Sequence, residues 1–286
     1  MTVLAGIRCN DGFIVAADTA VTFGDTVFRD RKVDYYKGGD FTVVVACAGD
    51  LAYAKMASQA IQEAIAHLNK PTTADIKLSV SNVLTHVYEK YIFPLWSARG
   101  SDYDGVFELI VAIQAQNEFE VLATSRTAVY SIERYHFAGS GAPIAQHLAE
   151  RYLRSRSEQH MTIPTAIAVH VVQQFFDIVK ISAPGVGRDT EIIAWRNSPD
   201  ADRFFTPPPQ MQDWLWALEE NLKYAIWEAL DRPGAPDGML QGLIEKIGSL
   251  LRAVHKHGQE DRNIGARAVR FTGRDKGEWR MQSLAD

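Results

Sequence analysis

The sequence predicts an α+β protein built of packed layers. Three observations support this prediction: strands and helices come in separate blocks, the strands are apolar along their whole length, and a run of breakers at residues 197–210 precedes a helix-rich stretch. Segregated blocks are typical of α+β architecture, whereas a parallel sheet would show βαβ alternation. We expect strands this apolar to be covered on both faces, by helices on one face and by a second sheet on the other.

The first fifty residues predict two β-hairpins. The four strands are expected at Val3–Cys9, Phe13–Ala17, Lys32–Tyr36 and Thr42–Cys47. Asn10-Asp11-Gly12 joins the first pair and is a strong hairpin signal. Gly38-Gly39-Asp40 supplies the turn of the second pair.

Helical periodicity begins at residue 50. Apolar residues recur at three- and four-residue spacing over residues 50–68, and a second helix opens at Thr73 and runs to about Tyr91. Strands, two more helices and a final strand follow. The later strands are expected at Val106–Ala115, Glu118–Thr124, Ala128–Ile132, Tyr135–Ala138 and Thr190–Trp195, and the later helices at Pro143–Arg154 and Pro164–Phe176.

The breakers predict a domain boundary, with a first domain over residues 1–197 and an extension over residues 198–286. The elements expected in the extension are a helical hairpin over Asp213–Leu230 and Met239–Val254 and a terminal β-hairpin that begins at Ala266. The apolar stripes of the two helices either pack on the first domain or contact a neighbouring subunit or another partner.

Composition excludes several classes of protein. The 286 residues are 47% hydrophobic and 23% charged, enough apolar surface for a core and too much for an intrinsically disordered chain. The net charge of −5 argues against nucleic acid or an anionic membrane as the main partner. Cys9 and Cys47 are too few for a disulfide framework and indicate a reducing compartment. With no targeting segment and no run of about 18 apolar residues, we expect a cytoplasmic protein.

Thr2 carries the chemical interest. Removal of Met1, which occurs when the second residue is small, would leave a threonine with both a hydroxyl and a free α-amine. An α-amine has an ordinary pKa of about 7.7 to 8.0 and is a usable base near neutral pH. One residue could then be nucleophile and general base together. Threonine is also a common second residue, so Thr2 alone assigns no function.

The stretch from Thr2 to Asp18 resembles the opening of proteasome β subunits and of the bacterial proteasome-like peptidase. In that family the nucleophilic threonine begins one strand and the next strand ends in Ala-Ala-Asp; the spacing to Asp18 matches without a gap. Further motifs extend the resemblance over roughly residues 2–195. They are Arg31-Lys32-Val33, Ala46-Cys47-Ala48-Gly49, Phe137-Ala138-Gly139-Ser140-Gly141 and the segment Asp177–Ser182.

The resemblance implies a four-layer αββα sandwich of the N-terminal-nucleophile hydrolase type, with the helical hairpin appended. It implies a threonine endopeptidase that needs no metal and no organic cofactor. Thr2 would attack a peptide carbonyl, Lys32 would place a positive charge beside the hydroxyl, and Asp18 would hold Lys32. The Gly49 N–H would stabilise the oxyanion.

Further site residues follow from the same resemblance. Ser140, Asp177 and Ser182 would hydrogen-bond around the threonine amine, and Val21 and Cys47 would lie at the substrate side-chain pocket. The lysine motif stands two residues nearer than usual, and Ala20 replaces an arginine common in the family.

Simpler interpretations stay open for several of these residues. Lys32 and Asp18 could form a surface ion pair worth under about 1 kcal/mol. Asp177 could be a surface carboxylate, Ser140 a plain turn residue and Cys47 an apolar wall residue.

The expected substrates are peptides or unfolded proteins, and the expected assembly is a homo-oligomeric ring. An ATPase partner stays open; nucleic acid and membrane are not expected partners. A catalytically silent structural ring subunit and an amidase acting on small amides are the alternative functions.

Overall fold

The computed structural model describes residues 2–23, 26–99, 106–153, 165–183, 186–187, 189–197, 268–273 and 279–283. The helical hairpin expected over residues 213–254 lies outside these ranges.

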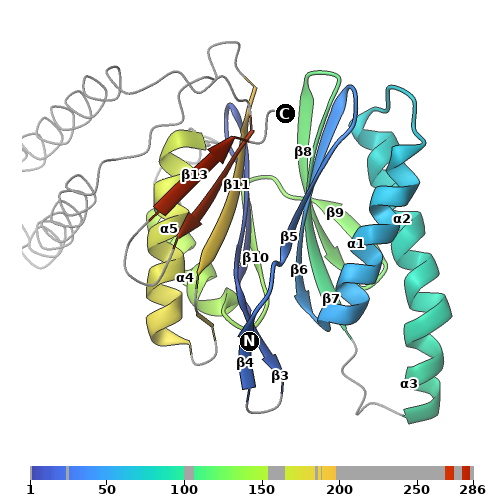
Figure 1. Ribbon diagram of the computed structural model, residues 1–286, viewed down its shortest axis with the longest axis horizontal. Coiled ribbons are helices and arrows are strands. Elements are labelled where there is room, and N and C mark those ends of the chain that lie inside the picture. The colour runs from blue at the N-terminus through green and yellow to red at the C-terminus, as the bar shows by residue number, and fades with distance from the viewer. Residues whose placement is uncertain are drawn as a thin grey trace, which may run out of the picture. The chain divides into compact units, whose positions relative to one another are not determined.

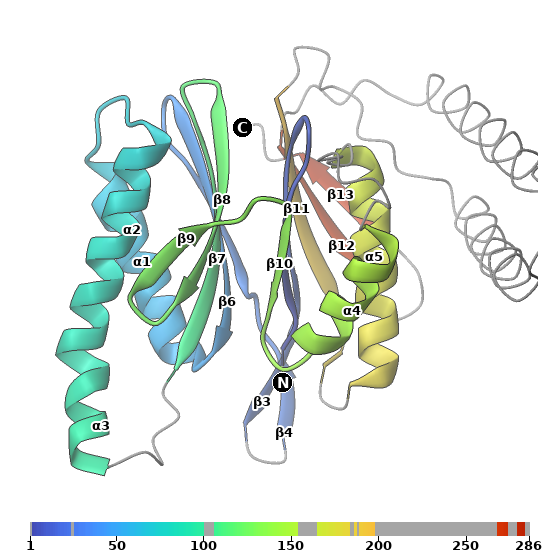
Figure 2. The same ribbon diagram turned by 180° about the vertical axis from the view of Figure 1, so that it is seen from behind.

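Two antiparallel sheets face each other, and helices cover the outer face of each (Figures 1 and 2). The six-stranded sheet contains, in spatial order, β10 (Tyr135–Ala138), β1 (Leu4–Arg8), β2 (Gly12–Asp18), β11 (Thr190–Arg196), β12 (Ala268–Gly273) and β13 (Trp279–Ser283). The five-stranded sheet contains β5 (Val33–Lys37), β6 (Phe41–Gly49), β7 (Phe107–Ala115), β8 (Glu118–Ser125) and β9 (Ala128–Ser131). The α+β class predicted from the block order is confirmed.

Helices α1 (Leu51–Ala66) and α2 (Thr73–Val87) lie on the five-stranded sheet, and α4 (Ala142–Tyr152) and α5 (Thr165–Ser182) lie on the six-stranded sheet (Figures 1 and 2). Asp50 caps α1 by accepting the N–H groups of Ala52 and Tyr53. Thr72 and Asp75 form a capping box at the start of α2. These local signals place each helix start where the sequence predicted it, within two residues.

Strand β6 illustrates why the strands are apolar throughout. Val43, Val45 and Cys47 face the core under α1 and α2, whereas Val44 and Ala46 face the core between the two sheets. Side chains alternate between the two faces of a strand, so a strand in the middle of these layers buries both sets. The expectation that both faces are covered is confirmed.

Two helices run further than expected. After α2 the chain continues through a π turn, η1 (Tyr88–Ile92), into α3 (Phe93–Arg99). The Phe93 N–H bonds to the Tyr88 carbonyl five residues back, and Pro94 has no N–H to satisfy, so the helix passes the proline. Helix α5 ends at Ser182 instead of near residue 176, because buried Val179 continues its apolar face.

Two hairpins complete the described chain. A hairpin of β3 (Ala20–Phe23) and β4 (Thr26–Arg29) was not expected, because all of β4 is exposed and its sequence lacks the alternation of a half-buried strand. The expected terminal hairpin is present as β12 and β13. Its strand β12 pairs with β11 and so extends the sheet of the first domain.

Candidate active site

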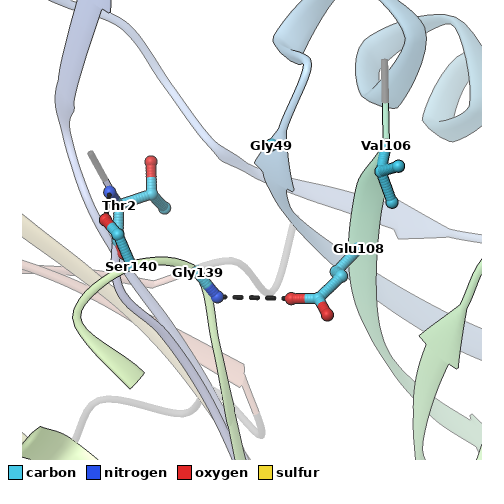
Figure 3. A pocket seen from close by; sticks show the side chains of 6 residues that line it. All are labelled: Thr2, Gly49, Val106, Glu108, Gly139 and Ser140. Carbon is cyan, nitrogen blue, oxygen red and sulfur yellow. Dashed lines mark hydrogen bonds between the residues drawn. The ribbon is translucent and has the colours of Figure 1, made fainter. Parts of the chain in front are cut away.

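Antiparallel pairing brings the ends of five strands together at one end of the two sheets. Leu4 at the start of β1 pairs with Ala17 near the end of β2 and with Ala138 at the end of β10. On the facing sheet, Gly49 at the end of β6 pairs with Phe107 at the start of β7. Thr2, two residues before β1, therefore lies where both sheets end (Figure 3).

Asp18 and Lys32 form a buried ion pair at this end. Lys32 Nζ lies 2.9 Å from Asp18 Oδ1, and the two side chains are 2% and 0% exposed. Asp18 also accepts the N–H groups of Val3 at 2.9 Å and Ala20 at 3.2 Å. The interpretation of this pair as a surface ion pair is therefore wrong: Asp18 is fixed by its own backbone surroundings and fixes Lys32 in turn.

Lys32 also reaches the hydroxyl of Thr2. Its Nζ donates a hydrogen bond of 2.7 Å to Thr2 Oγ1. Burial lowers the pKa of Lys32 from its ordinary value, while the charge of Asp18 acts in the opposite direction. In this position a protonated Lys32 would stabilise negative charge that develops on Thr2 Oγ1.

Ser140 and its neighbours hold the backbone of Thr2. The Thr2 N–H donates to Ser140 Oγ at 3.0 Å, and the Gly141 N–H donates to the Thr2 carbonyl at 3.0 Å. Gly139 has φ +85°, and a Cβ at this position would lie 2.5 Å from the Thr2 carbonyl oxygen. The Gly139–Gly141 turn is therefore shaped around Thr2, and Ser140 is more than a turn residue.

Gly139→Ala is expected to destabilise the protein by about 1 to 3 kcal/mol, because alanine is strained at positive φ, and to displace Thr2. The midpoint of urea unfolding measures the loss of stability. Gly39→Ala is the matched control, because a Cβ there meets nothing within 4 Å, and it should stay within about 0.5 kcal/mol. Equal midpoints for the two variants would show that the Gly139 turn imposes no such constraint.

A pocket of about 350 Å³ opens beside Thr2. Its lining residues are Thr2, Gly49, Val106, Glu108, Gly139 and Ser140. Figure 3 shows Glu108 reaching from β7 toward the Gly139 N–H, which it accepts at 3.3 Å. Gly49 therefore lies in the same pocket as Thr2, as the resemblance implied.

Val21 and Cys47, expected at a substrate pocket, are not among the residues lining this one. Val21 lies on β3. Cys47 is buried, its thiol lies 3.5 Å from the Lys32 carbonyl, and burial raises its pKa to about 12. A thiol in such surroundings stays protonated and acts as an apolar wall residue.

Asp177 and Ser182, expected around the Thr2 amine, are not among the residues that line the pocket beside Thr2. Both side chains are exposed on α5, and the Asp177 carboxylate lies 3.8 Å from Lys180 Nζ. Val179, whose side chain packs near Gly141, stands two positions after Asp177. Two helical positions differ by about 200°, so Asp177 points away from the site.

Two features of the site had escaped the sequence analysis. Glu108 stands next to the apolar run of β7, and a lone acid beside such a run was the available signal. The loop before β11 also approaches Asp18, whose Oδ2 lies 3.5 Å from the Gly187 N–H. In that loop Asp189 exchanges hydrogen bonds with Thr19 and forms an ion pair with Arg29. No local pattern marked these contacts.

The described residues contain no group of three or more His, Cys, Asp and Glu side chains placed to hold a metal ion. Among the helices of the described ranges, none has the length and apolar character needed to cross a membrane.

Comparison with protein families gives a match to the model described as "Proteasome subunit" over residues 2–186. A search of curated proteins gives no match.

Solved structures with similar folds include the Anbu complex from Pseudomonas aeruginosa, described as a helical assembly, with 16% identity and a TM-score of 0.59. The alignment covers 82% of this chain and 99% of that one. Anbu from Yersinia bercovieri gives 17% identity and a TM-score of 0.58, covering 82% and 100% of the two chains. An Anbu (Gly-1) mutant from Hyphomicrobium sp. strain MC1 gives 15% identity and a TM-score of 0.58, and the alignment covers 83% of this chain and 100% of that one. At these identities the likeness concerns the fold.

Proposed function

Because the chain belongs to the proteasome subunit family, we propose that it is a threonine peptidase in which Thr2 is the N-terminal nucleophile. The observation that carries this proposal is the 2.7 Å hydrogen bond from Lys32 Nζ to Thr2 Oγ1, made from within a buried ion pair. An ion pair between Lys32 and Asp18 that only stabilised the fold would not require a hydrogen bond from Lys32 to the hydroxyl of Thr2, which lines a pocket.

The proposed reaction begins once the residue before Thr2 has been removed. Thr2 Oγ attacks the peptide carbonyl, and its proton passes to the free α-amine, which lies beside Ser140 Oγ. Negative charge moves to the carbonyl oxygen, where the Gly49 N–H stabilises it. The amine then protonates the departing peptide amine, leaving an ester on Thr2.

Water completes the cycle. The α-amine takes a proton from the water, which attacks the ester carbonyl, and the acid product leaves as Thr2 Oγ regains its proton. Lys32 stabilises charge on Thr2 Oγ in both halves, and Asp18 keeps Lys32 in position. Every proton transfer uses groups of this chain and the substrate, with peptide and water converted to an amine and an acid.

The proposal includes a homo-oligomeric assembly. Family members of this fold work in assemblies whose chambers restrict access to the active site. The Pseudomonas aeruginosa protein is described as a helical assembly. A helical oligomer and a closed ring are therefore the two forms of assembly to look for. Peptides and unfolded chains are the proposed substrates.

Intact mass spectrometry before and after treatment with a β-lactone tests the proposal. A β-lactone ring opens on a nucleophilic hydroxyl and adds the whole mass of the probe. We expect the species lacking Met1 to gain one probe mass on Thr2 and the species retaining Met1 to gain none, because an extended amine cannot act as the base. The mechanism would be contradicted if the species that retains Met1 were labelled equally, or if the probe were attached to a residue other than Thr2. A mass that retains Met1 throughout would favour a silent subunit.

A further inference from the structure

Glu108 is the one charged side chain among the six residues that line the pocket, and the proposed reaction gives it no role. We propose that Glu108 selects substrates that carry a lysine or arginine side chain next to the scissile bond. This inference rests on the proposed function, because it concerns the same pocket.

Within the described ranges, Glu108 forms no ion pair with a lysine or arginine. Asp18, the other acid of the site, is paired with Lys32. In the described part of the chain, the Gly139 N–H is the hydrogen-bond donor to Glu108. A part-buried carboxylate with one backbone donor retains capacity for a charged partner.

Neighbouring groups do not supply that partner. Tyr88, Tyr130 and His136 all lie close enough to Glu108 for its charge to act on them. The two tyrosines are neutral at physiological pH, because burial raises the pKa of each. Burial lowers the pKa of His136, which favours its neutral form. Among the residues that line the pocket, Glu108 therefore offers a negative charge to a substrate.

The register of β6 and β7 sets the distance to the chemistry. Gly49 pairs with Phe107, and Ala48 pairs with Glu108. Opposed residues of antiparallel strands lie about 4.5 to 5.5 Å apart at Cα. A carbonyl held between Thr2 Oγ and Gly49 thus lies one residue from the strand position of Glu108. A lysine or arginine side chain beside that carbonyl spans the remaining distance to the carboxylate.

Glu108 could instead serve only to hold the Gly139 turn through its hydrogen bond. Glu108→Gln separates the two roles, because glutamine keeps a carbonyl acceptor of the same length and removes the charge. Glu118→Gln is the matched control: Glu118 lies exposed at the start of β8 and does not line the pocket.

The test uses acetylated fluorogenic peptides in matched pairs, with arginine or citrulline immediately before or after the scissile bond. Citrulline has nearly the shape of arginine and no charge. The wild-type protein should cleave one arginine peptide with kcat/KM about 10- to 100-fold above its citrulline partner, as a hydrogen-bonded charge pair provides. Glu108→Gln should abolish this preference, so that the two kcat/KM values become similar, and Glu118→Gln should keep it.

Equal cleavage of arginine and citrulline peptides by the wild type would overturn the inference, as would a preference that survives Glu108→Gln. The same peptides with a free N-terminus serve as a second set. A preference for arginine peptides that appears only in this set would assign the recognised charge to the terminal ammonium and overturn the side-chain assignment.

Failure of the proposed function is recognised separately, as the absence of any turnover by protein lacking Met1. In that case the inference is tested by ligand binding to the wild-type protein, measured by calorimetry. Acetyl-arginine amide should bind at least about 10-fold tighter than acetyl-citrulline amide. Glu108→Gln should bind the two alike. Equal binding by the wild type would overturn the selectivity, whether or not the protein hydrolyses peptides.

Discussion

Replacing Thr2 with alanine is expected to lower kcat/KM for peptide hydrolysis by about 10⁴-fold or more, since nucleophile and positioned hydroxyl are lost together. The side chain contributes its hydroxyl to Lys32 and little to the core, so the fold should be retained. Alanine is also small, which keeps removal of Met1 equivalent in the two proteins. Initial rates on one fluorogenic peptide measure the effect.

Two variants complete the Thr2 experiment. Thr2→Ser keeps a primary hydroxyl beside the same amine and should retain measurable turnover. Thr26→Ala, on exposed β4, is the matched control and should match the wild type. Peptidase activity in Thr2→Ala within tenfold of the wild type would exclude Thr2 as the nucleophile and leave the silent subunit or a contaminating protease as the explanation.

Lys32→Met is expected to destabilise the protein by about 3 to 5 kcal/mol, because it leaves the Asp18 carboxylate as an unpaired buried charge. Both partners are almost fully buried, and among the described residues Asp18 would keep the backbone donors of Val3 and Ala20 and the distant Gly187 N–H. Methionine has a similar length, so little of the loss comes from packing. Urea unfolding followed by circular dichroism gives the free energy of unfolding.

Lys55→Met provides the comparison for Lys32→Met. Lys55 lies 2.6 Å from Asp30 in a pair whose side chains are 41% and 35% exposed, and such pairs contribute under about 1 kcal/mol. The double variant Lys32→Met with Asp18→Asn should recover part of the lost stability, because the charge is removed with its partner. If Lys32→Met and Lys55→Met lowered the free energy of unfolding by similar amounts, the buried pair would stabilise the protein no more than the exposed one.

Local sequence signals predicted a helix, strand or turn correctly where interactions between neighbouring residues determine it. The turn at Asn10-Asp11-Gly12, the start of α1 near residue 50 and the apolar strand at Thr42–Cys47 each depend on neighbouring residues, and each lies where it was expected. The β3–β4 hairpin was missed because its exposed residues carry no pattern of burial. The extra length of α5 was missed because its last apolar residues pack through tertiary contacts.

The candidate site divides in the same way. The resemblance to proteasome β subunits pointed to Thr2, Asp18 and Lys32, and in the structure Lys32 Nζ lies within hydrogen-bond distance of both Thr2 and Asp18. Asp177 was also named from a motif, the segment Asp177–Ser182, yet its side chain is exposed beside Lys180, because the direction of a helical side chain depends on how the helix is turned against its sheet. Glu108 escaped notice because the turn it faces lies 31 residues further along the chain.

The sequence by itself determined the element types and the α+β class, since propensity, periodicity and capping act over a few residues. The threonine, lysine and aspartate of the candidate site were named from the resemblance to proteasome β subunits. Tertiary structure decided which strand ends meet, which side of α5 faces Gly141 and which carboxylate enters the pocket. Those outcomes depend on register and on the facing of two sheets, which join residues that no local pattern connects.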